Sequence, residues 1–213
     1  MARELWRQIG NVAADLPRFV TAPLYRSWHL RWGATDAEVA AAMPGDDLLP
    51  RAQFHPTRAI TIDAPPDQVW PWLVQVGCGR AGWYSDDLLD NPGRSSLRVI
   101  DPGLQNLKVG QWVPMSPFGA PSERTALRVD SFQDGRWLLW TMMPGTTWAW
   151  QLTPTPGNGT RLVTRVHGVY NWRHPLTAVF GVLLLEFGDF PMMRRMLLGI
   201  KQRAEGMSRA AVP

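Results

Sequence analysis

The chain has 213 residues, of which 45% are hydrophobic and 19% charged, and its formal net charge is +4. This length fits one domain with a small appendage, and the apolar fraction is sufficient for a core. The charge is a small imbalance without a run of five like charges, so we expect no nucleic-acid partner. The single cysteine, Cys78, excludes an internal disulfide and a multi-cysteine zinc site, and a reducing cytoplasm is the expected compartment.

Two features of the composition stand out. Twelve Trp against three Tyr indicate an aromatic-lined interior or an interface. Lys108 and Lys201 are the only lysines, and this preference for Arg, with many Ala, Gly and Pro, is typical of a GC-rich bacterial genome. The N-terminus lacks the pattern of a signal peptide, and the longest apolar run, 176–185, is about half of a membrane span. We therefore expect no spanning helix, and a membrane-peripheral location stays open.

Residues 1–57 are predicted to form an irregular N-terminal arm, ahead of a ligand-binding domain at 58–209. Apolar residues recur at helical spacing in the arm, and Pro17 should end that helix; they are Leu5, Ile9, Val12 and Leu16. Thr35 followed by Glu38 has the spacing of a capping box, which predicts a second short helix.

The domain should begin with a strand at 58–64 and continue with a helix that is opened by a proline and ends at Val76 before Gly77. Its buried face is predicted to hold Val69, Trp70, Leu73 and Val76. Ser85 is then expected to cap a short helix. Strands follow, separated by short turns, at 111–115, 125–132, 136–143, 146–152 and 160–170. A long helix from His174 to about Ala204, kinked at Pro191, closes the chain.

This order predicts an α+β fold in which a curved antiparallel meander packs one face against the long C-terminal helix. The chain resembles the START/polyketide-cyclase-like (SRPBCC) superfamily, with its helix-grip fold, over roughly residues 33–206. The resemblance rests on ITIDAPPDQVWPWLVQV, GRAGWYSDDLLDN, the TWAWQLTP and GTRLVTRV hairpin, MMRRMLLGIKQRAE and the leader WGATDAEVAAAMPGDDLLP. It implies a cavity for a hydrophobic ligand such as a lipid, sterol or polyketide. Some members of the superfamily are cyclases, dehydratases or ATPase activators.

Strand alternation selects the residues of the expected cavity. Leu138 and Trp140 share one face of their strand, as do Trp148 and Trp150, and Thr164 and Val166. In 136–143 the opposite face is apolar too, so the N-terminal arm is expected to cover it. In the fold that the chain resembles, the segment with Trp83 and Tyr84 overhangs the cavity mouth. The candidate ligand-binding residues are therefore Trp83, Tyr84, Leu138, Trp140, Trp148, Trp150, Thr164, Val166, Met192 and Met196, with ordinary core packing as the alternative.

The remaining chemical signals are weak. His167 should point to solvent, and the four histidines have no metal-site spacing, so neither a metal nor a cofactor is expected. Asp86 and Asp90 are four residues apart and could act as a carboxylate pair, although a solvated helix face is the simpler interpretation. Packing at a helix end is the simpler interpretation for Cys78.

Three functions follow. The first is binding of a hydrophobic small molecule in a closed, aromatic-lined cavity between the sheet and the C-terminal helix, without catalytic residues. The second is a polyketide cyclase or dehydratase that uses the same cavity and an acid or base such as Asp86 or Tyr84. The third is a peripheral membrane lipid carrier that uses Trp28, Trp32 and the apolar run 176–185.

The sequence also contains G-x-G-x-x-G at Gly77, Gly79 and Gly82. A dinucleotide site needs a strand before this motif and a parallel sheet around it, whereas here a helix precedes it and a meander follows. We interpret it as a turn between helices. Purified protein should therefore show no saturable binding of NAD, NADP or FAD in calorimetric titration, and saturable binding would contradict this interpretation.

Overall fold

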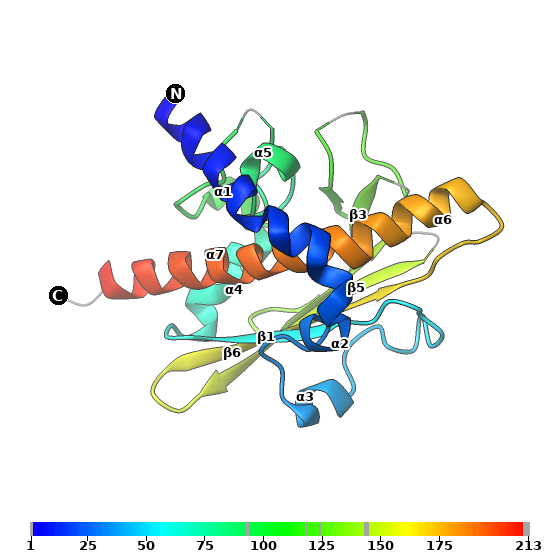
Figure 1. Cartoon of the computed structure of the whole chain (residues 1–213). Coiled ribbons are helices and arrows are strands. Elements are labelled where there is room, and N and C mark those ends of the chain that lie inside the picture. Colours follow the sequence, from blue (N-terminus) through cyan, green and yellow to red (C-terminus); the bar gives the residue numbers. More distant parts are fainter. Residues whose placement is uncertain (1, 93, 118, 124, 143–144, 211–213) are drawn as a thin grey trace.

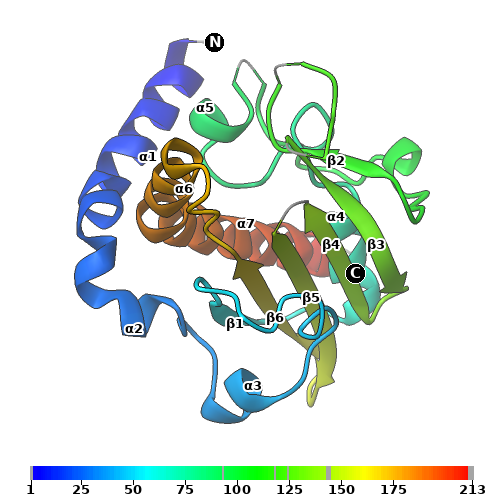
Figure 2. The same ribbon diagram turned by 90° about the vertical axis from the view of Figure 1, so that its right-hand side faces the viewer.

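The computed structural model describes residues 2–92, 94–117, 119–123, 125–142 and 145–210, without the side chains of Ala2, Glu4, Leu5 and Ala210. One antiparallel sheet with strand order β1-β6-β5-β4-β3-β2 curves around α7 (Figure 2). The strands are β1 Thr57–Ile62, β2 Trp112–Pro114, β3 Ala126–Gln133, β4 Trp137–Met142, β5 Thr146–Thr155 and β6 Gly159–Gly168. The predicted strands are thus confirmed, and Met143 and Pro144 lie outside the described residues.

The helices are distributed before, within and after the strands (Figure 1). Those before β1 are α1 Ala2–Thr21, η1 Ala22–Tyr25, α2 Arg26–His29 and α3 Asp36–Ala40. Between β1 and β3 lie α4 Pro66–Val74, α5 Asp87–Asp90 and η2 Pro102–Leu104, and the chain closes with α6 Pro175–Val182, η3 Leu183–Gly188 and α7 Asp189–Ala210. With α7 packed on the sheet, this is the predicted α+β helix-grip architecture.

The helix α4 differs from its prediction in where it ends and in which tryptophan it buries. It ends at Val74, two residues early, and its buried aromatic residue is Trp72, whereas Trp70 is half-buried beside Phe132. The apolar residues here are nearly continuous, so spacing alone does not decide which tryptophan faces the core. The choice matters because Trp72 reaches the candidate site described below.

The C-terminal helix runs on through Pro191, where a kink was predicted. The six residues of η3 just before it have π-helical hydrogen bonding, which changes the backbone pairing where proline supplies no N–H. Among the described residues, 175–209 is the one helix long and apolar enough to cross a membrane. Of its most apolar stretch of 18 residues, 22% is buried. Its second half is the core helix α7, through Met193, Met196, Leu197 and Ile200.

The N-terminal arm is more ordered than predicted. The expected end at Pro17 is wrong, because α1 continues to Thr21. Contacts on both sides of the proline accompany the continuous helix: before it Arg195 of α7 binds Asp15, and after it the hydroxyl of Thr21 donates to the carbonyl of Pro17 at 2.6 Å. Such contacts offset the backbone hydrogen bond that proline removes.

Residues 33–49 cover the outer face of the sheet, as the two apolar faces of β4 predicted. Met43 packs on Leu139, and Arg165 of β6 donates to backbone carbonyls at the end of α3. The capping box of α3 is confirmed. His167, which was predicted to face solvent, is half-buried 3.8 Å from a carboxylate oxygen of Asp46, because the same segment covers it.

A buried arginine joins the arm, the sheet and the last helix. Arg58 of β1 is 1% exposed, and its Nε donates to the carbonyl of His29 at 2.8 Å. Its terminal nitrogen binds Asp189, and the guanidinium lies 5.4 Å from the ring centre of Phe190. Burial, and then the charge of Arg58, lower the pKa of His29 to about 4. His29 is therefore neutral in the folded protein near pH 7.

The contact between α7 and the segment after Gly82 is close enough to test. A Cβ at Gly199 would lie 2.3 Å from the carbonyl oxygen of Tyr84, so Gly199→Ala must displace one backbone from the other. We expect this substitution to lower the free energy of unfolding by about 1–3 kcal/mol in urea titration. Gly206→Ala, on the same helix with open space around it, should be neutral or stabilising by up to about 1 kcal/mol. Equal effects of the two substitutions would contradict this packing.

Candidate functional site

Four tryptophans meet between the sheet and α7. Neighbouring rings among Trp140 of β4 and Trp148 and Trp150 of β5 have centres 5.3–6.0 Å apart. Trp83 stacks on Trp148 with ring centres 5.6 Å apart and an angle of 7° between the ring planes. All four are buried, in one core cluster with residues of α7. The strand faces were predicted correctly, but the rings pack on one another in the space where a closed cavity was expected.

The other predicted lining residues divide in the same way. Leu138, Val166 and Met196 belong to the core cluster. Thr164 accepts a 2.8 Å hydrogen bond from the indole nitrogen of Trp148, which satisfies both polar groups within the protein. Met192 is half-buried outside that cluster.

Trp83 and Tyr84 point to opposite sides of the chain. Both are buried, with Trp83 5% and Tyr84 4% exposed, so neither forms an exposed entrance to the space among the tryptophans. Tyr84 instead borders the groove described below. The Tyr84 hydroxyl donates to the carbonyl of Trp72 at 3.1 Å and accepts from the Gln75 side chain at 2.9 Å. Burial raises the pKa of Tyr84 far above its usual value. Its hydroxyl is therefore a structural donor rather than a base.

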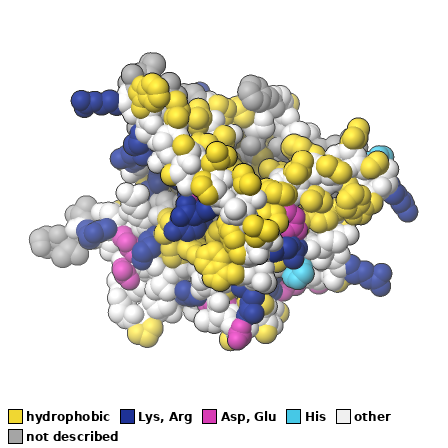
Figure 3. Space-filling model, viewed as in Figure 1, with side chains coloured by type: hydrophobic (Ala, Val, Ile, Leu, Met, Phe, Trp, Pro, Cys, Tyr) yellow, Lys and Arg dark blue, Asp and Glu magenta, His cyan; other side chains and the backbone are white. Residues whose placement is uncertain are grey.

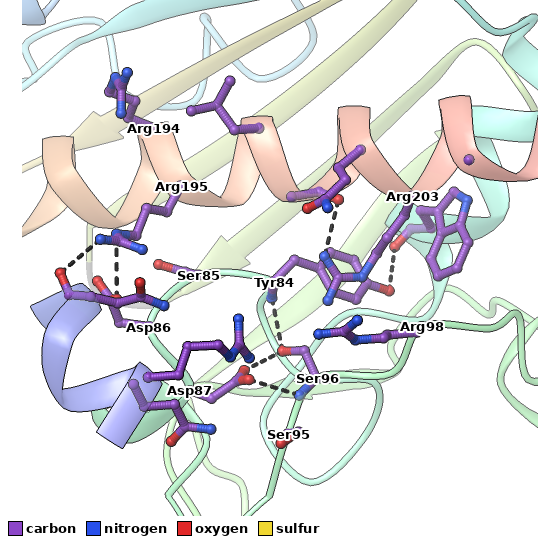
Figure 4. Close-up of a pocket in the computed structure, with 18 of the residues that line it drawn as sticks. Tyr84, Ser85, Asp86, Asp87, Ser95, Ser96, Arg98, Arg194, Arg195 and Arg203 are labelled. Carbon is purple, nitrogen blue, oxygen red and sulfur yellow. Dashed lines mark hydrogen bonds and ion pairs between the residues drawn. The ribbon is translucent and has the colours of Figure 1, made fainter. Parts of the chain in front are cut away.

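An open groove of about 1050 Å³ lies between α1, the segments 84–87 and 95–100, and α7 (Figure 4). Apolar side chains contribute to its wall, including Trp72, Ile100, Leu198 and Met207. Charged side chains converge on it from three parts of the chain: Arg7, Arg18, Arg98, Arg195 and Arg203, with Asp15, Asp86 and Asp87. Arg194 borders the groove too, but its guanidinium lies over the ring of Trp32 and points away from the groove (Figure 4). Five cations against three carboxylates favour an anionic ligand.

The carboxylates of the groove are held by its own residues. Asp15 is 2% exposed and bound by Arg18 and Arg195, and Asp87 accepts from the backbone N–H and hydroxyl of Ser96. Asp86 is 3% exposed, and its oxygen lies 3.4 Å from Nε of Arg195, an ion pair without hydrogen-bond geometry. Burial raises the pKa of Asp86, more than Arg195 lowers it. Asp86 is thus the group of the groove best placed to hold a proton.

Arg203 lies along the groove without being free to move. Its Nε donates to the carbonyl of Leu97 at 2.8 Å, and its guanidinium lies 4.4 Å from the ring centre of Tyr84. Arg98, on the opposite wall, is exposed (Figure 4). The groove therefore combines a fixed cation with an accessible one.

The short helix α5 corrects two expectations. Asp86 occupies its N-cap position, because the Ser85 hydroxyl donates to the carbonyl of Met192 instead. Asp86 and Asp90 are buried rather than on a solvated face. Burial, and then the charge of Asp87, raise the pKa of Asp90 to about 8. Cys78 is buried near Asn91, and burial raises the pKa of its thiol, which fits a packing role.

The glycine motif forms a turn. Gly77, Gly79 and Gly82 all have positive φ, and Gly77 and Gly82 exchange backbone hydrogen bonds at 3.1 and 3.2 Å. A helix precedes the turn and the sheet is antiparallel, so the elements of a dinucleotide site are not assembled here. Within the described residues, no three His, Cys, Asp or Glu side chains are grouped to hold a metal ion.

Solved structures resemble the chain at low identity. They include the polyketide-cyclase-like protein Cgl2372 of Corynebacterium glutamicum, with TM-score 0.46, 14% identity and coverage of 77% of this chain and 98% of that one. NE0264 of Nitrosomonas europaea has TM-score 0.42 and 14% identity, with coverage of 72% of this chain and 95% of that one. A Thermobifida fusca protein has TM-score 0.41 and 16% identity, with coverage of 72% of this chain and 94% of that one. No protein-family model and no curated protein matches. Function is therefore inferred from this chain's own side chains.

The sequence reasoning missed the groove. Its arginines lie on α1, in the segment 95–100 and on α7, and no local spacing in the sequence connects them. One available signal was the preference for Arg over Lys, since arginine binds carboxylates and phosphates through a planar fork. Another was Asp86, in the segment judged most informative.

Asp90 makes stability depend on pH in a defined direction. A carboxyl with its folded-state pKa raised to about 8 stays protonated, while the unfolded chain ionises near 4, so this group lowers stability as pH rises between these values. Asp90→Asn should flatten that part of the profile and raise the free energy of unfolding at pH 7. Urea titrations from pH 4 to 8 measure both, with Asp134→Asn in the exposed hairpin turn as control. A profile unchanged by Asp90→Asn would contradict the assignment.

Proposed function

We propose that the protein binds an amphipathic small molecule with an anionic head group in the groove between α1 and α7. The convergence of arginines from three segments on one open volume carries the proposal. A guanidinium binds a carboxylate or phosphate through two parallel N–H donors, and a partly buried site strengthens that bond relative to open solvent.

The apolar part of the groove supports the amphipathic character of the ligand. Leu198 and Met207 lie on the same helix as Arg195 and Arg203, so apolar and cationic side chains alternate along one wall. Trp72 contributes a large apolar side chain at the inner side. Small-molecule sites typically combine an apolar lining with a few polar groups that fix orientation.

A ligand bound within the tryptophan cluster is the alternative position. It keeps the lining predicted from sequence, and it requires the ligand to displace Trp83 from its stack on Trp148. The 8% exposure of Trp148 is the observation in its favour. The groove needs no such displacement, so we place the ligand there.

Acid–base catalysis in the same groove is the second candidate function. Asp86 is buried there, and burial raises its pKa, which is the direction needed for a carboxyl that donates a proton. Catalysis would appear as a change in mass of the bound molecule, abolished by Asp86→Asn. Native mass spectrometry of the purified protein identifies that molecule.

The proposal predicts preferential binding of an anionic amphiphile. Dansylaminoundecanoic acid should bind more tightly than its neutral methyl ester in fluorescence titration. Arg98→Gln should weaken binding of the acid roughly tenfold, or about 1.4 kcal/mol, because an accessible guanidinium is lost. Arg136→Gln, in an exposed hairpin turn, should have no effect.

The same titration separates the two positions. Trp148→Phe should leave the affinity unchanged if the ligand occupies the groove, and weaken it severalfold if the ligand lies among the rings. Equal affinities for the acid and the ester, together with no effect of Arg98→Gln, would overturn the proposal.

A further inference from the structure

A row of apolar side chains on α6 and η3 lies open to solvent. Its members are spaced at i, i+3, i+4, i+7 and i+8, which places them on one face of the helix; they are Leu176, Val179, Phe180, Leu183 and Leu184. Leu176 is 88% and Phe180 66% exposed. Among the described residues, nothing covers this face.

A second exposed row follows the arm from α1 to α2. Leu16, Val20, Leu24 and Trp28 are each four residues apart, and all are exposed. The helix α1 contacts η3, and Figure 3 shows apolar side chains gathered over α1 and over α6 on one face of the molecule. We call the two rows, with Trp6 and Trp172 beside them, the apolar face.

The charges around the apolar face are mainly positive. Arg3 and Arg18 lie on α1, and Arg173 lies just before α6. Two nearby carboxylates are neutralised: Asp15 by Arg18 and Arg195, and Glu186 by Arg26, whose Nε lies 2.6 Å away. The side chain of Glu4 is not among those that the structure describes.

We propose that this apolar face docks the protein on the surface of an anionic lipid bilayer. Exposed tryptophans beside apolar rows suit the boundary between head groups and acyl chains, and arginines around them suit anionic head groups. The exposed part of the last helix, α6 with η3, has 14 residues and a length of roughly 21 Å, short of the roughly 30 Å of a hydrocarbon core. The inference is therefore docking on the bilayer and not crossing of it.

The arm connects docking with the groove. On α1, Arg7, Asn11 and Asp15 face the groove, while Leu16 and Val20 belong to the apolar face. Trp28 and the run 176–185 thus have the exposure expected of a membrane-peripheral protein. Trp32 does not, because it is half-buried near Phe190 with Arg194 over its ring.

Vesicle sedimentation of the full chain tests the proposal. Wild-type protein should sediment with vesicles containing roughly one third phosphatidylglycerol in phosphatidylcholine, and much less with phosphatidylcholine alone or at high salt. The double substitution Leu176→Ser with Phe180→Ser should reduce binding at least roughly tenfold. Val109→Ser, at a loop position that is 67% exposed outside the apolar face, should leave it unchanged.

Two further measurements make every outcome decisive. The first is the affinity of the double variant for dansylaminoundecanoic acid without vesicles. An affinity equal to that of the wild type shows that the fold and the groove are intact. A loss of vesicle binding then reports on docking and not on the proposed function. Light scattering measures oligomeric state. Absence of vesicle binding overturns docking, and so does a dimer that the double variant dissociates, since a second copy would then cover the face.

Discussion

The stacking of Trp83 on Trp148 is the contact on which the arrangement of this molecule depends. It brings the segment after the glycine turn against the sheet, and with Trp140 and Trp150 it fills the space beneath α7. Four buried indoles contribute a large apolar area to stability. The groove lies on the other side of the last helix.

The helix α7 consequently serves two surfaces. Met193, Met196 and Ile200 pack toward the sheet, and Arg195 and Arg203 face the groove. The apolar residues recur at helical spacing, so the arginines between them fall on the opposite face without further constraint. Burial of one face thus fixes the positions of the cations on the other.

The fold was largely readable from the sequence because its elements are local. The Asp134-Gly135 turn, the alternation of 146–152 and the capping box of Thr35 each depend on residues within a few positions of one another. Alternation also identified the inner faces of the strands. It could not tell whether Trp148 and Trp150 line a cavity or fill it, because that depends on Trp83, which arrives from more than 60 residues away.

The groove was not readable for a related reason. Asp15 and Arg195 are 180 residues apart, and no spacing rule links them. The end assigned to α1 at Pro17 was wrong as well, because α1 continues to Thr21. Burial of Asp86 and Asp90 was missed because an i, i+4 pair of acids normally faces water, whereas here the face of α5 that carries them is buried.

The tie between Asp15 and Arg195 also determines how the groove could open. It joins α1 to α7 by one carboxylate rather than by a continuous apolar seam, and the backbone carbonyl of Asn11 adds a 2.7 Å hydrogen bond from the same arginine. An anionic ligand that draws Arg195 to itself competes directly with Asp15. The ligand would then weaken the contact between α1 and α7 as it binds, so that entry and release both depend on the ion pair of Asp15 and Arg195.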